Sequence, residues 1–179
     1  MTPVGTAIWP RVNEPDVKFD PDGVYTCDLR LDHEEGKALL AKLEAFVTAD
    51  KKARKAADEK IHKSKNELPV RLETDRDTGE LVETFIVKTK TKRRPLVVDS
   101  QKSPVSENVG GGSQLRLSIN VKSYNNGAIG YGITLQLKAV QVLELREFSS
   151  SGANDFDVVD DGFVATPSSD GDAADGGDF

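Results

Sequence analysis

Cysteine and histidine are scarce in this sequence, which has one cysteine, Cys27, and two histidines among 179 residues. A single cysteine excludes an internal disulfide and any zinc site built from several cysteines. Long apolar runs are also absent, because nothing approaches the ~18 residues of a membrane span and no basic-then-apolar leader opens the chain. We therefore expect a cytoplasmic protein in which Cys27 is a small core residue, on one face of a strand with Tyr25 and Leu29.

Motifs of catalysis, cofactor binding and metal binding are missing as well. No serine stands in a nucleophile elbow, the two histidines lack metal-ligand spacing, and no phosphate-binding loop ends in a lysine–serine pair. The run "DRDTG" at residues 75–79 has its glycine one position early for a calcium loop and lacks the final bidentate acid. We therefore predict a protein that is not an enzyme and needs no cofactor or metal.

Positive charge is absent from residues 151–179, which carry eight of the 30 acidic residues, all of them aspartate. The other 22 acids and all 24 bases lie in residues 1–150, so a body of net charge +2 carries a segment of −8. Serine, glycine and aspartate dominate this segment. The composition predicts one folded domain over residues 1–150, followed by a disordered acidic tail over residues 151–179.

Apolar periodicity within the body predicts about five or six strands, the first being a strand or an extended entry that Pro10 closes, and one helix. The helix starts after Asp32, which forms a capping box with Glu35, and continues toward Pro69. The extended segments are expected at residues 5–12, 24–32, 70–73, 81–94, 95–100, 114–124 and 131–148. This pattern fits an all-β fold with one inserted helix, best the OB-fold, a five-stranded Greek-key barrel; an open sandwich is the alternative.

The stretch "IVKTKTKRRP" combines five bases with no acid. A period of two places Lys88, Lys90 and Lys92 on one face of a strand, and Arg93 and Arg94 extend the basic patch. The patch fits a surface that holds phosphates. It also fits the solvated outer face of an edge strand, where lysines discourage aggregation.

The polar face of residues 114–124 carries the bases Arg116 and Lys122 and ends in the aromatic residue Tyr124. A ring on a wet face beside bases suits stacking on a nucleobase, worth ~1–3 kcal/mol per base. Trp9 shares a face with Arg11 in the same way, although either ring could instead cap a barrel end. Because the bases of a duplex are already stacked, this pattern favours single-stranded nucleic acid bound without sequence preference.

The acidic segment ends in "DGDAADGGDF". A tethered polyanion beside a weakly basic groove would occupy that groove until DNA displaces it, and salt would weaken both contacts. The ring and free carboxylate of Phe179 suit a partner pocket with an apolar floor and a basic rim. The partner-binding residues are then Asp172, Asp175, Asp178 and Phe179, unless the segment serves solubility alone.

Five segments of the sequence occur in a fixed order along the chain: "GVYTCDL", "LVVDSQ", "GGGSQLRLSINVKSYNNGAIGYGITLQLKAVQVLEL", "DGFVA" and a terminal Asp-Phe. In order and spacing they resemble the single-stranded DNA-binding protein of T7-like phages. By position, the groove tyrosine of that family matches Tyr124, a groove lysine matches Lys88 and the terminal aromatic matches Phe179. Where the family has an arginine just before "GVY", this chain has Asp22, so DNA contact by that loop is not implied.

The resemblance implies an oligonucleotide-binding barrel that coats single-stranded DNA during replication, recombination and repair, in the cytoplasm of an infected bacterial host. It also implies a homodimer whose acidic tail shields the DNA groove and contacts the phage DNA polymerase and the helicase-primase. Two other functions stay open from the residues: a protein-interaction adaptor that recognises partners through its tail, and an RNA-binding chaperone built on the same barrel.

Overall fold

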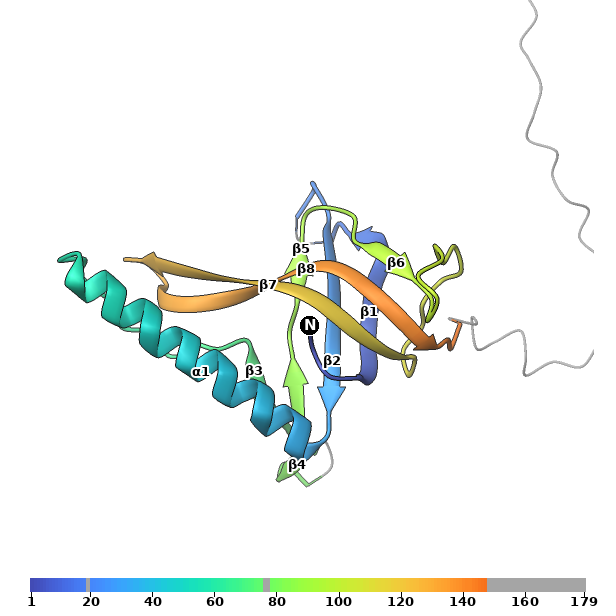
Figure 1. The fold of residues 1–179 in the computed structure, drawn as a ribbon, viewed down its shortest axis with the longest axis horizontal. Coiled ribbons are helices and arrows are strands. Elements are labelled where there is room, and N and C mark those ends of the chain that lie inside the picture. Colours follow the sequence, from blue (N-terminus) through green and yellow to red (C-terminus); the bar gives the residue numbers. More distant parts are fainter. Residues whose placement is uncertain (19, 76–77, 148–179) are drawn as a thin grey trace, which may run out of the picture. The chain divides into compact units, whose positions relative to one another are not determined.

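The body of the chain is a strongly curved sheet with one long helix beside it (Figure 1). The computed structural model describes residues 1–18, 20–75 and 78–147. The helix, α1, spans His33–Ala56. The strands are β1 (Gly5–Asp16), β2 (Val24–Leu31), β3 (Val70–Thr74), β4 (Leu81–Val87), β5 (Lys90–Thr91), β6 (Leu96–Val98), β7 (Gln114–Asn126) and β8 (Gly130–Glu144).

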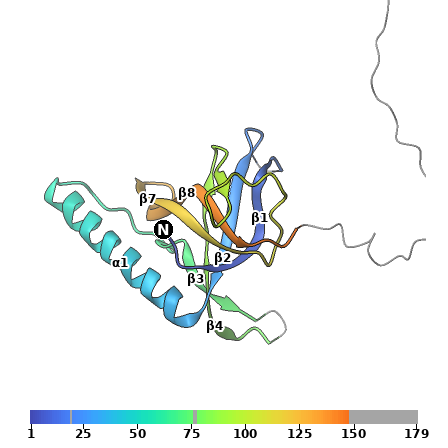
Figure 2. The ribbon, with the colours of Figure 1, turned by 45° about the vertical axis from the view of Figure 1, so that its right-hand side comes forward.

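Five of the strands close into a barrel (Figure 2). β1 pairs with β2, β2 with β5, β5 with β8, β8 with β7, and β7 with β1. The β5–β8 pairing is parallel, whereas the other four are antiparallel. This closed ring confirms the predicted OB-type barrel with one inserted helix and excludes the open sandwich. Outside the ring, β4 pairs with β2 and β3 with β4, while β6 runs parallel to β8.

The barrel interior is filled by the apolar side chains that alternate along the strands. On β2 the buried residues are Cys27, Leu29 and Leu31, and on β7 they include Leu115 and Leu117. Burial, and secondarily the charge of nearby Asp28, raises the pKa of the Cys27 thiol to about 12. The thiol therefore stays protonated at neutral pH, which confirms that Cys27 is a core residue.

Helix α1 begins where its capping residue predicts. The side chain of Asp32 accepts a hydrogen bond of 2.8 Å from the backbone N–H of Glu35. Gly36, in the first turn, lies against Phe85 of β4, and a Cβ at this position would stand 2.6 Å from the Cβ and Cγ of Phe85. A glycine is therefore needed for the helix to approach the sheet this closely.

Helix α1 ends at Ala56, so the prediction that it continues toward Pro69 was wrong. The apolar stripe of the helix is buried only as far as Val47. Ile61 and Leu68, farther along the chain, pack against the core from a non-helical segment. A longer helix would carry both residues away from the sheet. Burial of their apolar surface favours the extended path, over the helical propensity of the intervening alanines and lysines.

Pro10 does not close the first strand, contrary to the prediction, because β1 continues to Asp16. The pairing of β1 with β2 shifts its register between Ile8 and Arg11. Trp9 and Pro10 occupy this bulge, where the ladder is locally interrupted and a missing backbone N–H is tolerated.

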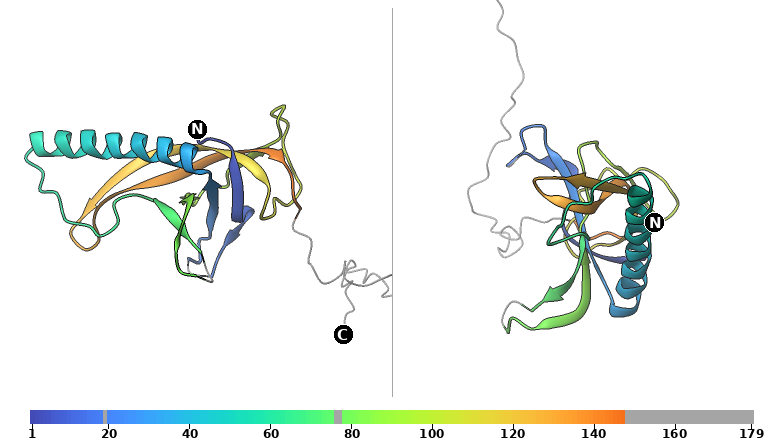
Figure 3. Two further views of the ribbon diagram at one scale, coloured as in Figure 1. Left: turned by 90° about the horizontal axis from the view of Figure 1, so that it is seen from below. Right: turned by 90° about the vertical axis from the view of Figure 1, so that its left-hand side faces the viewer.

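Beyond the barrel, β7 and β8 continue as a two-stranded arm, residues 120–136, that runs beside α1 (Figure 3). The segment that leaves the helix returns along β8. The backbone N–H of Tyr131 donates to the carbonyl oxygen of His62 at 3.0 Å, and that of Ile133 donates to Glu67 at 2.8 Å. One edge of the arm is thus covered, and one of its faces is turned to the helix.

Candidate nucleic-acid interface

The alternation predicted for the basic stretch is present around β5. Lys88, Lys90 and Lys92 are exposed, whereas Thr89 and Thr91 between them are 2% and 5% exposed. The hydroxyl of Thr89 donates a hydrogen bond of 2.7 Å to the carbonyl oxygen of Cys27, which ties the stretch to β2. The stretch is not one continuous strand, since β4 ends at Val87 and β5 holds two residues, but the three lysines still project on one side.

A polar row crosses the outer face of the barrel at the level of Lys90. The paired positions run from β1 through β2, β5 and β8 to β7, and each row member points away from the core. The row consists of Arg11, Thr26, Lys90, Gln136 and Asn120. With a strand spacing of ~4.8 Å, these five positions extend over roughly 19 Å. Residues distant in sequence therefore form one continuous polar track.

Next to this row lies a hollow of about 260 Å³, here called the basic hollow. Its lining residues are Asp20, Val24, Lys90, Thr91, Lys92, Lys122, Thr134 and Gln136. The fold thus brings Lys122, from the second basic segment of the sequence, to the same place as Lys90 and Lys92.

Tyr124 lies on the same face of β7 as Lys122, two residues farther along the arm. Its cross-strand partner is Gly132, and a Cβ on this glycine would stand 2.6 Å from the Cζ atom of Tyr124. The tyrosine ring therefore lies over the glycine backbone, in space that any other residue would fill. The lysine-bearing stretch and the tyrosine are on one side of the molecule. A continuous binding path for single-stranded nucleic acid requires this arrangement.

Lys92 differs from the other lysines of the basic hollow because it is paired with acids. Its Nζ lies 2.9 Å from Oδ2 of Asp20 and 3.0 Å from Oδ2 of Asp22. These hydrogen bonds raise the pKa of Lys92, and the hydrogen bond from Lys92 holds the pKa of Asp20 below its usual value. The loop between β1 and β2 therefore brings negative charge to the rim of the hollow.

Trp9 is 72% exposed and has a left-handed backbone conformation, with φ of 46°. This conformation is unfavourable for a bulky residue and costs of order 1–3 kcal/mol. Trp9 stands at the bulge that precedes Arg11, the first member of the polar row. A ring left in solvent at a strained position does not cap the barrel, and it is available for contact with a ligand.

Four of the predicted bases, namely Lys88, Arg93, Arg94 and Arg116, do not line the basic hollow. Arg94 lines a separate hollow of about 330 Å³ together with Pro95 and Leu96. Arg93 is exposed, and its backbone N–H donates to the hydroxyl of Thr91. Arg116 lies opposite Gln141, six residues before Lys122 on β7, and its Nε is buried with no hydrogen-bond partner among the described residues.

Lys88 lies at the other end of the lysine stretch, where β4 ends. Its backbone N–H donates to the carbonyl oxygen of Pro69 at 2.8 Å. Its charge, with that of Arg71, lowers the pKa of Asp28, although burial of Asp28 is the larger influence and the pKa is raised overall. The predicted residues Asp172, Asp175, Asp178 and Phe179 lie outside the residues that the structure describes.

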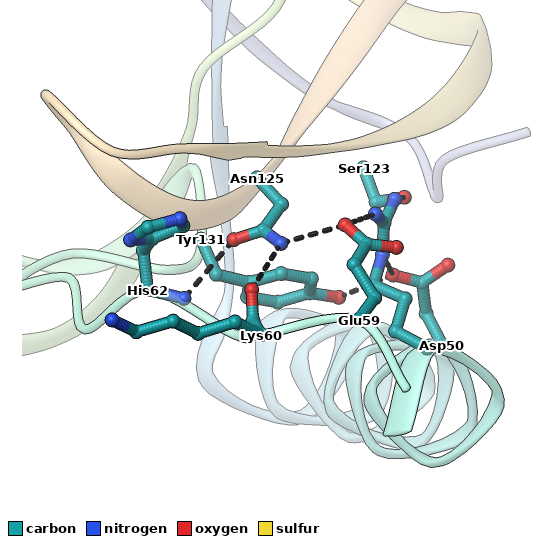
Figure 4. Close-up of polar contacts among 8 residues, drawn as sticks. Asp50, Glu59, Lys60, His62, Ser123, Asn125 and Tyr131 are labelled. Carbon is teal, nitrogen blue, oxygen red and sulfur yellow. Dashed lines mark hydrogen bonds and ion pairs between the residues drawn. The ribbon is translucent and has the colours of Figure 1, made fainter. Parts of the chain in front are cut away.

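The face of the arm opposite Lys122 and Tyr124 is held by a network of polar contacts (Figure 4). The hydroxyl of Tyr131 donates to Oδ2 of Asp50 at 2.9 Å, and Nε of Arg54 donates to the same oxygen at 2.7 Å. Arg54 also donates to the hydroxyl of Ser123 at 2.9 Å. Asn125 accepts from the backbone N–H of His62, so both strands of the arm are tied to the helix and the segment after it.

Residues 6–168 match the family described as the Enterobacter phage Enc34 ssDNA-binding protein. The chain belongs to this family. A relative within the phages is the single-stranded DNA-binding protein of Enterobacteria phage T3, with 30% identity over 175 residues, which cover 83% of this chain and 75% of the T3 protein. The resemblance to the T7-like phage proteins, inferred above from sequence segments, is confirmed.

Solved structures of similar fold include single-stranded DNA-binding proteins of two phages. The structure of gp2.5, a single-stranded DNA-binding protein encoded by bacteriophage T7, has a TM-score of 0.61 at 23% identity and covers 84% of this chain and 94% of its own. The Enc34 protein in complex with ssDNA has a TM-score of 0.63 at 18% identity and covers 82% and 86%. At these identities the likeness shows the fold alone.

Three members of the polar row were not predicted as site residues from the sequence, namely Thr26, Asn120 and Gln136. Their outward direction follows from the alternation along their strands. Their position relative to Lys90 depends on the β2–β5 pairing for Thr26 and on the parallel β5–β8 pairing for Gln136 and Asn120. Among the described residues, no group of three or more histidine, cysteine or acidic side chains could hold a metal ion. Within the same residues no helix has the length and apolar character needed to cross a membrane.

Proposed function

We propose that this protein binds single-stranded DNA without sequence preference, along the outer face of the barrel and the arm. The observation that carries the proposal is the basic hollow, which gathers Lys90 and Lys122 beside a tyrosine ring that lies over Gly132. Membership of the Enc34 family of phage ssDNA-binding proteins supports the same function.

The contacts would divide between phosphates and bases. Lys90 and Lys122 have no ion-pair partner among the described residues, so they are available to the phosphates, as is Arg11 at the start of the polar row. Tyr124 would stack on one base and Trp9 on another, since every base offers a π-face. Because neither contact reads the edge of a base, the binding is expected to be independent of sequence.

Single-stranded DNA is exposed when duplexes are opened, copied or exchanged. A protein that coats it would act in replication, recombination and repair, and we propose that role for this chain. On the same proposal the acidic tail, with Asp172, Asp175, Asp178 and Phe179, contacts the phage DNA polymerase and helicase-primase, and the protein acts as a homodimer in the host cytoplasm. Light scattering at micromolar concentration would test the dimer, because a homodimer has twice the molar mass of one chain.

The tail is proposed to compete with DNA for the basic face of the barrel. Its support is the segregation of charge, with eight aspartates and no base in residues 151–179 beside a body of net charge +2. Deletion of residues 151–179 is expected to tighten DNA binding at low salt and to abolish binding of the polymerase. Unchanged affinity of the truncated protein at low salt would rule out the competition.

The central experiment is a titration of a fluorescent oligo(dT) by fluorescence anisotropy at 50 and 200 mM salt. If about four phosphates are neutralised, the slope of log K against log salt is about −2.8, a loss of roughly 50-fold between the two concentrations. Lys90→Ala should weaken binding and flatten this slope, whereas Lys42→Ala, which removes an exposed lysine of the helix, should not. An RNA oligonucleotide of the matching sequence serves as competitor; stronger binding of RNA would favour a chaperone, and no binding of either would favour an adaptor.

A further inference from the structure

One of the three lysines around the basic hollow is already occupied by the protein itself. Lys92 contacts the carboxylates of Asp20 and Asp22, whereas Lys90 and Lys122 form no ion pair within the described residues. Asp20 also lines the hollow. The three charges of Asp20, Asp22 and Lys92 sum to −1. This corner of the hollow is therefore acidic, whereas Lys90 and Lys122 make the rest of it basic.

The turn at residues 20–23, between β1 and β2, holds the carboxylate of Asp20 in place. Oδ1 of Asp20 accepts from the backbone N–H of Asp22 at 3.2 Å, and the carbonyl oxygen of Asp20 accepts from Gly23 at 2.8 Å. Gly23 has φ of 75° and lies against Pro15, where a Cβ would stand 2.8 Å from the Cβ of the proline. The turn therefore depends on glycine, and it sets the backbone positions from which Asp20 and Asp22 reach Lys92.

Two carboxylate oxygens at about 3 Å from one ammonium resemble the contact that a phosphodiester would make with it. A phosphate that approaches Lys92 must either displace these oxygens or lie beside them. In both cases the negative phosphate lies close to two negative carboxylates. The pairing is exposed to solvent, with 59% of the Lys92 side chain accessible, so it is a weak interaction in itself. Its effect on DNA comes from the charge that it places in the path of the backbone.

We propose that Asp20 and Asp22 limit how many phosphates the basic hollow accepts, by withholding Lys92 from the DNA backbone. The inference rests on the proposed function, since it concerns the same hollow. It makes the two aspartates determinants of affinity: the hollow of the natural protein offers Lys90 and Lys122, and a third phosphate contact appears when the acids are removed.

The test is the double substitution Asp20→Asn with Asp22→Asn in the full chain. Asparagine keeps the Oδ1 acceptor that the turn uses but loses the charge. We expect tighter binding of oligo(dT) and a salt slope steeper by about 0.7, so that the gain in affinity is about 2.6-fold larger at 50 than at 200 mM salt. The matched control is Glu44→Gln with Glu83→Gln, which removes two exposed acids on the helix and on β4 and should leave the slope unchanged.

The role of Lys92 is tested by Lys92→Met, alone and combined with the double substitution. If Lys92 is withheld in the natural protein, Lys92→Met alone leaves the salt slope unchanged, and in the combined variant the gain from Asp20→Asn and Asp22→Asn disappears. A slope that flattens by about 0.7 in Lys92→Met alone would show that Lys92 already contacts a phosphate, which overturns the inference. An equal gain with and without Lys92 would overturn it too.

The same titrations separate this inference from the proposed function. If the natural protein binds oligo(dT) with a steep salt slope but the double variant behaves as its control, the inference fails and the function stands. If the natural protein does not bind oligo(dT), the function itself fails. Thermal unfolding of each variant shows whether it is folded; should the double variant not fold, the slope of Lys92→Met alone still decides.

Discussion

The two faces of the β7–β8 arm carry similar polar side chains that have different roles. On the face toward the helix, Ser123 and Asn125 are hydrogen-bonded to Arg54, Glu59, Lys60 and His62. On the opposite face, Lys122 lines a hollow open to solvent and Tyr124 lies over a glycine. Successive residues of one strand are thus structural or available for binding according to whether the fold supplies a partner.

The face of the arm toward the helix, here called the inner face, contains the buried residue Tyr131, whose hydroxyl bonds to Asp50. Burial and the hydrogen bond to Asp50 raise the pKa of Tyr131 to about 12. Burial alone would raise the pKa of Asp50, but hydrogen bonds from Arg54, Tyr131 and Ser123 outweigh it and hold that pKa below its usual value. The tyrosine is therefore neutral and the aspartate ionised over the physiological range, which is the arrangement that the hydrogen bond needs.

The largest effect is expected on stability, from Tyr131→Phe. This substitution removes one hydrogen bond of the inner face and leaves the outer face, with Lys122 and Tyr124, unchanged. Loss of a hydrogen bond to a charged group should lower the free energy of unfolding by about 2 kcal/mol. Because the folded-state pKa of Tyr131 is raised, its contribution is fully present below pH 10 and is lost as the pH rises through about 12. Urea unfolding of both proteins between pH 7 and 12 measures this difference.

If the two faces act separately, Tyr131→Phe leaves the affinity for oligo(dT) at neutral pH within about twofold of the natural protein, as expected for an interaction that touches no ligand. A stability difference that persists unchanged to pH 12 would contradict the role given to the hydroxyl.

Tyr124→Ala is expected to show the reverse pattern. Loss of stacking on one base, ~1–3 kcal/mol, should weaken binding of oligo(dT) by roughly 5-fold to 150-fold. The melting temperature should change little, because the ring lies on the outer face. Anisotropy titration and thermal unfolding of the same sample provide the two readings; a large loss of melting temperature with unaltered binding would assign Tyr124 to the fold instead.

Gly132→Ala sharpens the comparison by moving the ring without deleting it. A Cβ at this position would stand 2.6 Å from Cζ of Tyr124, so the ring must leave its place over the backbone. Part of the stacking energy is then lost, and binding should weaken by roughly threefold to tenfold. In a Tyr124→Ala background the substitution should have no further effect on binding, and the double-mutant cycle measures this coupling.

The smallest effect is expected from Lys122→Ala, which removes one phosphate contact. The salt slope of oligo(dT) binding should flatten by about 0.7, equivalent to about 2.6-fold less sensitivity between 50 and 200 mM salt. Lys42→Ala on the helix is the control for a general change of charge. A slope that stays the same in Lys122→Ala would place the DNA elsewhere.

Much of the architecture was predictable because it depends on local patterns. The alternation in "VYTCDLRL" correctly placed Cys27 in the core, and Asp32 correctly marked the start of the helix. The helix end was missed because Ile61 and Leu68 are drawn to the core by contacts distant in sequence. The strand through Pro10 was missed because a bulge in the pairing with β2 accommodates the proline.

The candidate site was predictable only in part. Charge and alternation picked out Lys90, Lys122 and Tyr124, which the structure brings to one side of the molecule. The same reasoning gave equal weight to Arg94, which lines a different hollow, and to Lys92, whose partners come from the loop before β2. The sequence shows that a residue is basic, but it does not show which acid forms an ion pair with that residue.

The sequence by itself determined which residues face the core and which face water, because the two-residue repeat of a strand and the capping of a helix act over a few positions. It also determined the separation of a weakly basic body from an acidic tail. Only the tertiary structure decided that Lys122 stands beside Lys90 and that acids hold Lys92. The parallel β5–β8 pairing brings Lys122 near Lys90, and the loop between β1 and β2 brings Asp20 and Asp22 to Lys92. Both arrangements join segments that are distant in sequence, so they depend on the packing of the whole barrel.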